Sequence, residues 1–289
     1  MAINTSALLS YVEEQNLPLI RKSVLGARTI KYLTLQTGVV GPTAINLLET
    51  SVEFGDGSTC GWNANGETRL SQRKIVPANL KVNMSFCDKQ MLSTWAQHEV
   101  RVAAGHEQLP FEEAFVAGIT EQIGEKLDTA IWQGVYINGT HYNGFLNLGG
   151  NTTEKGSTVY ASTRNVYNAL PAASLDKSAI FMGIDTFRAL AGELTEKNLY
   201  HYDPKVDEAF EMILPGTTIK VIGVPGLNST NKIVALNTAH SVYGTDMSGD
   251  EEVFKLWYSD DNQEFRLKVN FTEGVQVAFT DEMIVCDLA

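Results

Sequence analysis

The sequence of 289 residues predicts an α+β fold, and three patterns along it lead to that class. An amphipathic helix is expected at 110–134, a half-buried strand at 80–86, and a series of short strands through the tail at 253–285. Strands that follow one another directly form antiparallel hairpins, so this mixed order favours an α+β architecture over a doubly wound parallel sheet. The hydrophobic content of 44% is sufficient for a buried core.

The helix at 110–134 carries the clearest periodicity in the chain. Pro110 suits its first turn and Gly134 suits its end. At about 1.5 Å per residue the helix would be on the order of 36 Å long, enough to support one face of a flat domain. A shorter helix is expected before it, at 93–104. The apolar side chains of the long helix recur every four residues and predict one buried stripe: Phe111, Phe115, Ile119, Ile123, Leu127 and Ile131.

Residues 45–86 predict a long two-stranded finger. The first strand ends near Phe54, and the alternation of apolar and polar residues over 80–86 indicates the second. Between them lies a loop rich in Gly and Asn, residues that tolerate positive φ. A lone hairpin is marginally stable in water, so we expect the finger to lie on a neighbouring subunit, with Trp62 as an anchor. The expected contact residues at the tip are Gly55, Asp56, Gly57, Gly61, Trp62, Asn63 and Gly66.

The first 40 residues predict an arm that needs a partner surface. Ser6 is the expected N-cap of a short helix that ends near Pro18, and 28–40 alternates loosely, as an extended strand does. The arm has a net charge of +2, whereas residues 240–289 carry −8. The two ends either attract each other between subunits or are both solvated surfaces. The basic residues expected to contact a neighbour are Arg21, Lys22, Arg28 and Lys31.

After Gly149 and Gly150 the pattern alternates between helices and strands. Asp185 is the expected N-cap of a helix that continues to Lys197, and further helices are expected at 164–170 and 205–213. Strands are expected at 179–182, 219–224, 233–236, 253–258, 265–269, 275–279 and 283–285. Three tryptophans fall in periodic segments and are expected in the core: Trp95, Trp132 and Trp257.

The sequence lacks the patterns of the common catalytic and cofactor sites. There is no Gly-Lys pair for a phosphate-binding loop and no Gly-x-Ser-x-Gly nucleophile elbow. His98 and His106 are eight residues apart, not the four that let two imidazoles share a metal on one helix. The paired acids at 251–252 and 260–261 lie in polar turns, where exposed carboxylates make poor catalysts. We therefore expect no catalytic residue, no cofactor and no metal, and a protein that is not an enzyme.

Charge, hydropathy and cysteine content limit the kinds of partner and the cellular compartment that we expect. The net charge of −12 argues against a protein that grips nucleic acid, because neutralising phosphates requires clustered Lys and Arg. Residues 1–17 do not have the pattern of a secretory signal, and no stretch reaches the roughly 18 apolar residues that span a bilayer. The three cysteines are far apart and indicate neither a disulfide framework nor a zinc site. We expect a protein made in a reducing cytoplasm, with no membrane contact.

The order of these segments resembles the major capsid proteins of tailed bacteriophages, which have the Hong Kong 97-type shell fold. The resemblance covers essentially the whole chain, from an extended arm and a glycine-tipped hairpin to a long helix and an α+β region. The C-terminal part is the most similar in amino-acid sequence. The similar segments are IVALNTAHSVYGTD at 233–246, FKLWYSD at 254–260, FRLKVNF at 265–271 and GVQVAF at 274–279.

The resemblance implies four structural parts. An N-terminal arm would cover 1–44 and reach a neighbour, and an E-loop at 45–86 would overlap an adjacent subunit. A peripheral domain with a long spine helix would comprise 87–150 and 251–289. An axial domain at 151–250 would meet its copies at fivefold and sixfold centres.

The resemblance also implies a structural function. Such subunits assemble through pentamers and hexamers into the icosahedral capsid that encloses the phage's double-stranded DNA, without sequence-specific binding. Many relatives carry an N-terminal scaffolding segment that a protease removes, whereas here the arm starts almost at Met1. We therefore expect a separate scaffolding protein or none, with portal and decoration proteins as further partners. The expected location is the virion capsid, assembled in the host bacterial cytoplasm.

Two other interpretations are open at this point. An encapsulin, a compartment shell with the same fold, differs from a phage capsid subunit in its contents rather than in its chemistry. A soluble α+β enzyme would need a pocket lined by clustered carboxylates or histidines, and the sequence supplies no such cluster. The glycine-rich finger and the amino-acid sequence of the C-terminal segments favour the phage capsid subunit.

Overall fold

The computed structural model of the chain describes most of the two sheets, the long helix and the finger. Expectations for the helix at 93–104, for Trp95 and for the N-terminal segment before residue 26 lie outside the described residues. The described ranges are 26–54, 58, 66–87, 111–137, 141–197, 209–246, 253–259, 261–262 and 264–288.

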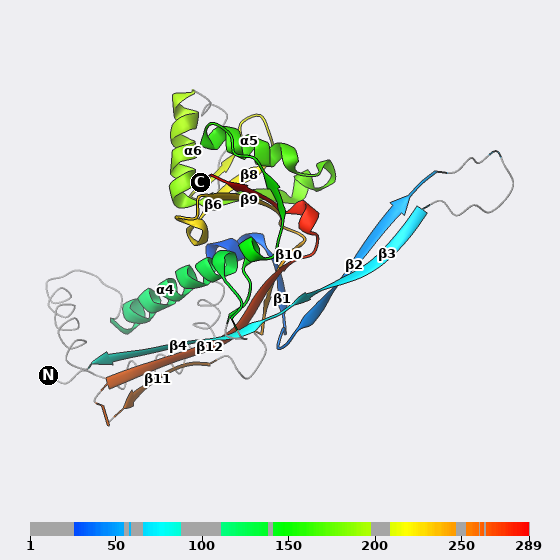
Figure 1. Cartoon of the computed structure of the whole chain (residues 1–289). Helices are drawn as coiled ribbons and strands as arrows, with labels where there is room; N and C mark the ends of the chain where they lie inside the picture. Colours follow the sequence, from blue (N-terminus) through cyan, green and yellow to red (C-terminus); the bar gives the residue numbers. More distant parts are fainter. Residues whose placement is uncertain are drawn as a thin grey trace.

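Two mixed sheets form the body of the molecule (Figure 1). In the first sheet the strand order is β1-β10-β12-β11, and β4 also pairs with β12. Only its β1–β10 pair is parallel. The expectation of an α+β architecture is confirmed. The strands of this sheet are β1 (Thr34–Thr37), β4 (Ala78–Cys87), β10 (Ser241–Thr245), β11 (Val253–Ser259) and β12 (Glu264–Val277).

The second sheet has the order β5-β13-β9-β6-β8-β7 and packs against two helices, α5 (Val159–Ala169) and α6 (Ile184–Glu196). Its central strands β6 and β9 are buried along their length except at Lys232, as expected for strands covered on both faces. The strands are β5 (Asn151–Thr153), β6 (Ser178–Gly183), β7 (Glu211–Ile213), β8 (Lys220–Val224), β9 (Lys232–Asn237) and β13 (Ile284–Asp287). Short 3-10 helices connect these elements: η2 (Phe145–Asn147), η3 (Ala172–Lys177), η5 (Pro225–Leu227) and η6 (Thr280–Glu282).

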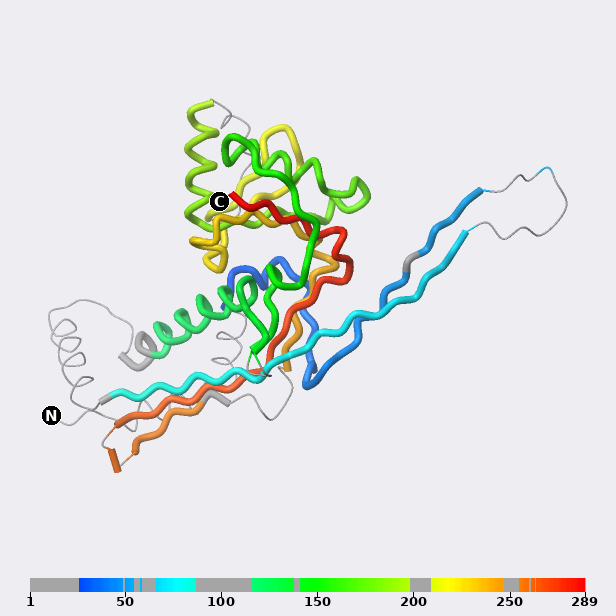
Figure 2. The backbone as a smooth tube through the Cα atoms, in the orientation of Figure 1, coloured from blue at the N-terminus to red at the C-terminus, as the bar shows by residue number. Residues whose placement is uncertain are grey.

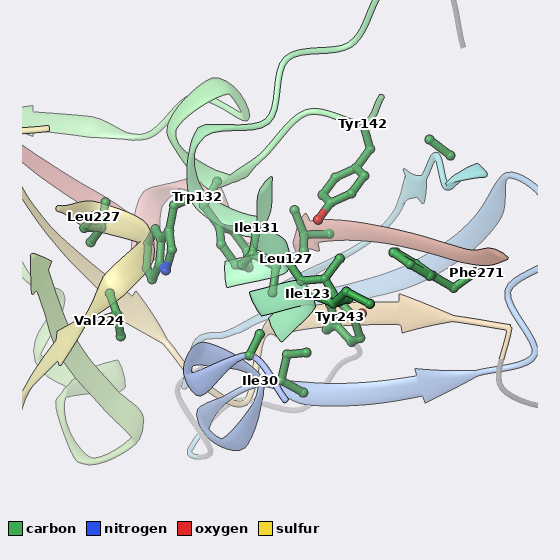
Figure 3. Close-up of a cluster of buried hydrophobic side chains, with 14 of the residues drawn as sticks. Ile30, Ile123, Leu127, Ile131, Trp132, Tyr142, Val224, Leu227, Tyr243 and Phe271 are labelled. Carbon is green, nitrogen blue, oxygen red and sulfur yellow. The ribbon is translucent and has the colours of Figure 1, made fainter. Parts of the chain in front are cut away.

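The long helix α4 (Phe111–Gln133) has the predicted bounds to within one residue. It runs alongside β4 and β12 in the lower part of Figure 1. The predicted stripe is buried wherever its side chains are described, at Ile119, Ile123, Leu127 and Ile131, and Trp132 joins it in the core (Figure 3). The same core includes side chains of both sheets, so α4 fixes one sheet against the other.

The segment before β1 differs from the predicted strand. Residues Arg28–Tyr32 form a 3-10 helix, η1, and only 34–37 is extended. Ile30 and Ala27 are buried against the core, while Thr29 packs at the end of α4 with its hydroxyl accepting a hydrogen bond from Trp132 Nε1 at 2.8 Å. This stretch therefore packs on its own chain, because Ala27, Thr29 and Ile30 are all buried.

The finger has different strands from those predicted. β2 (Thr43–Val52) pairs with β3 (Gly66–Ile75) over ten residue pairs. Residues 80–86 do form a strand with the predicted alternation, since Leu80, Val82, Met84 and Phe86 are half-buried between exposed neighbours. That strand, β4, pairs with β12 in the body instead of with the finger. Period-two alternation shows which side chains face the core, but it does not identify the partner strand.

The tail strands expected at 265–269 and 275–279 are one continuous strand, β12. The intervening polar residues resemble a turn in sequence, but Glu273 is completely buried and Thr272 nearly so. Gly274 allows the close approach of the finger base, since a Cβ atom there would lie 3.1 Å from the side chain of Ile75.

Three smaller expectations also need correction. Residues 211–213, predicted as the end of a helix, form strand β7. The N-cap of α6 is Gly183 rather than Asp185, and the backbone N–H of Ile184 donates to Asn228 Oδ1 at 2.7 Å instead. Trp257 is half-buried rather than a core residue. The predicted strands over 179–182, 219–224, 233–236 and 253–258 are confirmed to within one residue at each end, and the strand predicted at 283–285 extends two residues further, to Asp287. In the described part of the chain, no helix is both long and apolar enough to cross a membrane.

Replacing Ile123 with Asp tests the packing of α4. Ile123 is 5% exposed, so the variant would bury a carboxylate without a partner. We expect a loss of roughly 4 kcal/mol of unfolding free energy, measured by urea denaturation. Glu121→Ala, an exposed change on the same helix, is the matched control and should stay within about 0.5 kcal/mol of the parent. A parent-like stability of the Asp variant would contradict this packing.

Candidate assembly interface

The finger is largely exposed: along β3 only Arg73 and Ile75 are not exposed. It projects away from both sheets as a two-stranded ribbon (Figures 1 and 2). At about 3.3 Å per residue its ten paired positions extend on the order of 33 Å. It nevertheless carries four large apolar side chains that are more than half exposed: Leu48 (61%), Val52 (72%), Phe54 (100%) and Leu70 (82%). A two-stranded ribbon with such side chains in water gains stability by packing against another surface.

The register of β2 and β3 gives the finger two unlike faces. Leu48 lies directly opposite Leu70 on one face, and Thr50 lies opposite Thr68. On the same face Gln72 Nε2 donates to Asn46 Oδ1 at 2.8 Å. The other face carries an exposed ion pair, with Arg69 Nη2 3.0 Å from Glu67 Oε2. From the Asn46–Gln72 pair outward this face carries no charged side chain, so that part of it can be covered without removing a charge from water.

The base of the finger is fixed to the body. Ile75, Val39 and Val242 form a small buried cluster where the finger meets β10. Arg73 Nη1 donates to the carbonyl of Val277 at 2.9 Å, and Gln276 Nε2 donates to the carbonyl of Lys74 at 2.8 Å. A rigid base and an exposed shaft are what a docking element requires.

Gly66 is the one predicted tip residue that falls within the described ranges. It closes the ribbon opposite Val52 with φ of 127°, a conformation that favours glycine. A Cβ atom there would lie 2.5 Å from the carbonyl oxygen of Ser51, so any side chain would open the ribbon. The other predicted contacts, Gly55, Asp56, Gly57, Gly61, Trp62 and Asn63, lie outside the described residues.

Of the basic arm residues, Arg28 and Lys31 are described, and Arg21 and Lys22 are not. Arg28 contacts its own chain: Nη2 donates to the carbonyl of Ala209, and the guanidinium lies 5.5 Å from the ring centroid of Phe210. Lys31 is exposed. The contact of these side chains with a neighbouring subunit stays a prediction.

A buried carboxylate on α4 joins three distant segments. Asp128, 1% exposed, accepts hydrogen bonds from the backbone N–H of Thr29 at 2.9 Å and of Gly226 at 2.7 Å. Burial raises the pKa of Asp128, and these hydrogen bonds partly oppose that rise. Gly226 is required for the approach, because a Cβ atom there would lie 2.2 Å from the carbonyl oxygen of Asp128.

A second buried carboxylate lies near the base of the finger. Glu273 accepts hydrogen bonds from Tyr142 Oη at 2.7 Å and Tyr243 Oη at 2.6 Å. Desolvation by burial raises the pKa of Glu273 to about 7, against the lowering effect of the two hydroxyls. Figure 3 shows Tyr142 and Tyr243 in the core beside the stripe of α4. Sequence reasoning missed this group, because nothing local marks an acid that two distant tyrosines will bind.

The described residues contain no group of three or more potential metal ligands. His141 is exposed, and His240 Nδ1 lies 2.5 Å from Glu282 Oε2 at the surface. The Asp128 carboxylate contacts backbone amides, and the Glu273 carboxylate contacts tyrosine hydroxyls. Their geometry is suited to holding segments together.

Comparisons with known proteins agree on the fold. No protein-family model matches this sequence, and no curated protein matches it either. Solved structures do match. The capsid of an empty GTA particle has 10% identity and a TM-score of 0.58, covering 93% of this chain and 90% of that one. A structure of Gordonia phage Cozz has 11% identity and a TM-score of 0.62, covering 90% of this chain and 85% of that one. A virus-like particle from Pyrococcus furiosus has 9% identity and a TM-score of 0.55, covering 95% of this chain and 98% of that one.

These likenesses extend over nearly the full length of each chain, at identities too low to carry more than architecture. The chain therefore has the Hong Kong 97-type capsid fold, as the resemblance in sequence implied. It shares this fold with the major capsid proteins of tailed phages.

The Glu273 cluster predicts a pH-dependent stability. The folded-state pKa of about 7 lies above the unfolded value of 4.5, so the cost of the buried charge is absent below about pH 4.5 and grows until pH passes 7. Between pH 4.5 and 8 the parent should lose about 3 kcal/mol of unfolding free energy through this group. Glu273→Gln, which has no charge to titrate, should lose that much less over the same range in urea denaturation of unassembled subunits. Glu121→Gln, on the exposed face of α4, is the control. An unchanged pH dependence in Glu273→Gln would refute the assignment.

Proposed function

We propose that this chain is the subunit of the icosahedral capsid of a tailed phage, assembled through pentamers and hexamers around double-stranded DNA. The observation that carries this proposal is the exposed, two-faced finger on a body with the capsid fold. Its apolar face has no core of its own to join within the described chain. A second copy of the chain supplies that surface in a shell. The solved structures with this fold include several phage capsids.

The domain assignment follows the same proposal. The E-loop at 45–86 contains the finger, and β4 at its end belongs to the body sheet of the peripheral domain. The peripheral domain at 87–150 and 251–289 contains the spine helix α4, and the axial domain at 151–250 contains most of the second sheet. The arm at 1–44 contacts a neighbouring subunit, with Arg21, Lys22, Arg28 and Lys31 as the proposed contact residues.

The partners of the subunit are further copies of itself, a portal, and any scaffolding or decoration proteins of the same phage. The acidic chain encloses DNA without binding it tightly, because a net charge of −12 repels the DNA phosphates. The protein acts through assembly and catalyses no reaction. Its location is the virion capsid, after assembly in the cytoplasm of the host bacterium.

A compartment shell that encloses protein cargo is the second candidate. The virus-like particle from Pyrococcus furiosus matches over 95% of this chain, so the fold also occurs in a particle that is not named as a phage capsid. Electron microscopy and size-exclusion chromatography of the purified protein are the deciding experiments. Closed shells or ring-shaped capsomers support the subunit proposal, and their contents, DNA or protein, distinguish the two kinds of shell. A compact monomer at every concentration, also in the presence of co-expressed scaffolding candidates, would overturn it.

Removing the finger tip separates folding from assembly. Deletion of 56–65 leaves Glu53, Phe54 and Gly55 to connect the Val52–Gly66 pair, a loop length that hairpins accommodate. Because the finger base packs independently of the tip, we expect a melting temperature within about 2 °C of the parent. We expect no closed shells by negative-stain microscopy. Closed shells at the parental yield would show that the tip is not an assembly element.

A further inference from the structure

The face of the first sheet that points away from α4 is open and polar. Alternation turns the apolar side chains of β4, β11 and β12 toward α4, where Leu256, Leu267 and Met84 pack in the core. Most side chains of the opposite face, called here the polar sheet face, are exposed or half-buried. The described ones are Asn79, Lys81, Asn83 and Ser85 of β4, Lys255, Trp257 and Ser259 of β11, and Glu264, Arg266, Lys268, Asn270 and Thr272 of β12.

Positive charge is concentrated on the polar sheet face. Its described cations are Lys81, Lys255, Arg266 and Lys268, and its one described acid is Glu264, a net charge of +3 in a chain of −12. The register sets Lys255 directly opposite Lys268, and like charges in this position destabilise a sheet. An anion above the two ammonium groups would offset their repulsion.

The lysines of this face have no anionic partner within the described part of the chain. Glu264 is already engaged, because Arg266 Nε donates to its Oε1 at 2.8 Å, a hydrogen bond that lowers the pKa of Glu264. Lys81 and Lys255 are exposed and Lys268 is half-buried. None of the three forms an ion pair with a described acid. They are therefore available to an anion from outside the subunit.

The dimensions of the cationic band suit a phosphate backbone. Three neighbouring strands span about 10 Å, and the four residues from Arg266 to Asn270, which lies opposite Lys81, span about 14 Å. One strand of a DNA duplex presents a phosphate about every 3.4 Å of its axis, so about four phosphates fit along the band. The exposed amide of Asn83, opposite Lys268, adds a neutral donor of the kind that contacts phosphate oxygens.

The acidity of the whole chain does not prevent this local attraction. At physiological salt the Debye length is about 8 Å, so a phosphate on the polar sheet face interacts mainly with the charges beneath it. The acids elsewhere on the subunit are largely screened at that distance. The contact would be weak and strongly dependent on salt, which agrees with a shell that encloses DNA without binding it tightly.

The two faces of this layer differ in charge. α4 covers the apolar face of the sheet (Figure 1), and its own exposed side carries Glu121, Glu125 and Lys126, a net charge of −1. In a shell one subunit thick, one of the two faces points to the interior. A polyanion inside the shell favours the orientation that brings the cationic face toward it.

We propose that the polar sheet face lines the interior of the shell and contacts the phosphate backbone of the enclosed DNA through Lys81, Lys255 and Lys268. This inference rests on the proposed capsid function and specifies which surface of the subunit meets the DNA. The contact reads charge alone, so it is the same for every DNA sequence. The exposed side of α4 then points outward.

Photocrosslinking in DNA-filled particles tests the orientation. One variant carries the photoreactive residue p-benzoylphenylalanine in place of Asn83, on the polar sheet face. The matched control carries it in place of Gln122, an exposed amide on the other side of the layer. After irradiation and nuclease digestion, nucleotide adducts on the protein are measured by mass spectrometry. We expect at least about tenfold more adduct at position 83 than at position 122, because only the first lies against the sugar-phosphate backbone.

Equal adduct at both positions, more at 122, or none at either in DNA-filled particles would overturn the orientation and leave the capsid function intact. Particles that assemble but hold no DNA would refute the proposed phage capsid. The affinity of the polar sheet face for DNA is measured separately, so the two failures are distinguishable.

The salt dependence of DNA binding by unassembled subunits provides that measurement, with a short duplex followed by fluorescence anisotropy. Lys255→Gln combined with Lys268→Gln should lower the slope of log affinity against log salt by about 2, since each phosphate contact contributes about 0.9. Lys126→Gln combined with Lys177→Gln removes the same charge from exposed positions elsewhere and should keep the parental slope.

Equal slopes in the two double variants would overturn the assignment, and so would a parent that binds no DNA at low salt. Competition with poly-glutamate tests the other class of polyanion. DNA should remain bound at an equal concentration of carboxylates. Tighter binding of poly-glutamate would identify the polar sheet face as a site for acidic peptides and would overturn the proposal.

Discussion

The carboxylate of Asp128 is the interaction on which the arrangement of the body depends. It is buried on the long helix and holds backbone amides from η1 and from η5, segments about 100 residues away on either side in the sequence. If either amide lost its acceptor, a polar group would be left buried without a partner, at a cost of about 1–3 kcal/mol each. The contact is selective as well as stabilising, because only glycine at 226 lets η5 approach the helix so closely. The second sheet is thereby held against α4 in a single position.

The first sheet is organised around β12, which pairs with two different strands along one of its edges. β12 pairs with β4 over its first ten residues and with β10 over its last five, and Glu273 belongs to both registers. The two tyrosines that bind Glu273 come from β10 and from the loop after α4. Helix, finger base and sheet therefore meet at one buried acid. Their relative positions depend on the two hydrogen bonds to this acid, which are buried and so shielded from competition with water.

Much of this fold could be predicted from the sequence where periodicity determines burial. The four-residue repeat of α4 gave the correct buried stripe, and the alternation at 80–86 gave the correct faces of β4. The partner of β4 could not be predicted, because alternation is the same whether a strand pairs in a finger or in a body sheet. The 3-10 helix at Arg28–Tyr32 was missed because its conformation depends on contacts with Asp128 and Trp132. The glycine-rich composition marked the finger, but its apolar face emerged only from the register that sets Leu48 opposite Leu70.

Two segments connect the finger to the body: residues 38–42 between β1 and β2, and Val76 with Pro77 between β3 and β4. Proline fixes its φ, and the strands on both sides of Val76 and Pro77 are hydrogen-bonded, so this second connection has little freedom to act as a hinge. A shell built from one chain needs a different angle between neighbours around a fivefold axis than around a sixfold axis. In the shell proposed for this chain, that difference can be absorbed along the ribbon itself, by twisting and bending of a two-stranded sheet whose residues are mostly in solvent. The curvature of such a particle would then depend on the elasticity of the finger as well as on rotation at the 38–42 connection, where Gly38 has a φ of 76°.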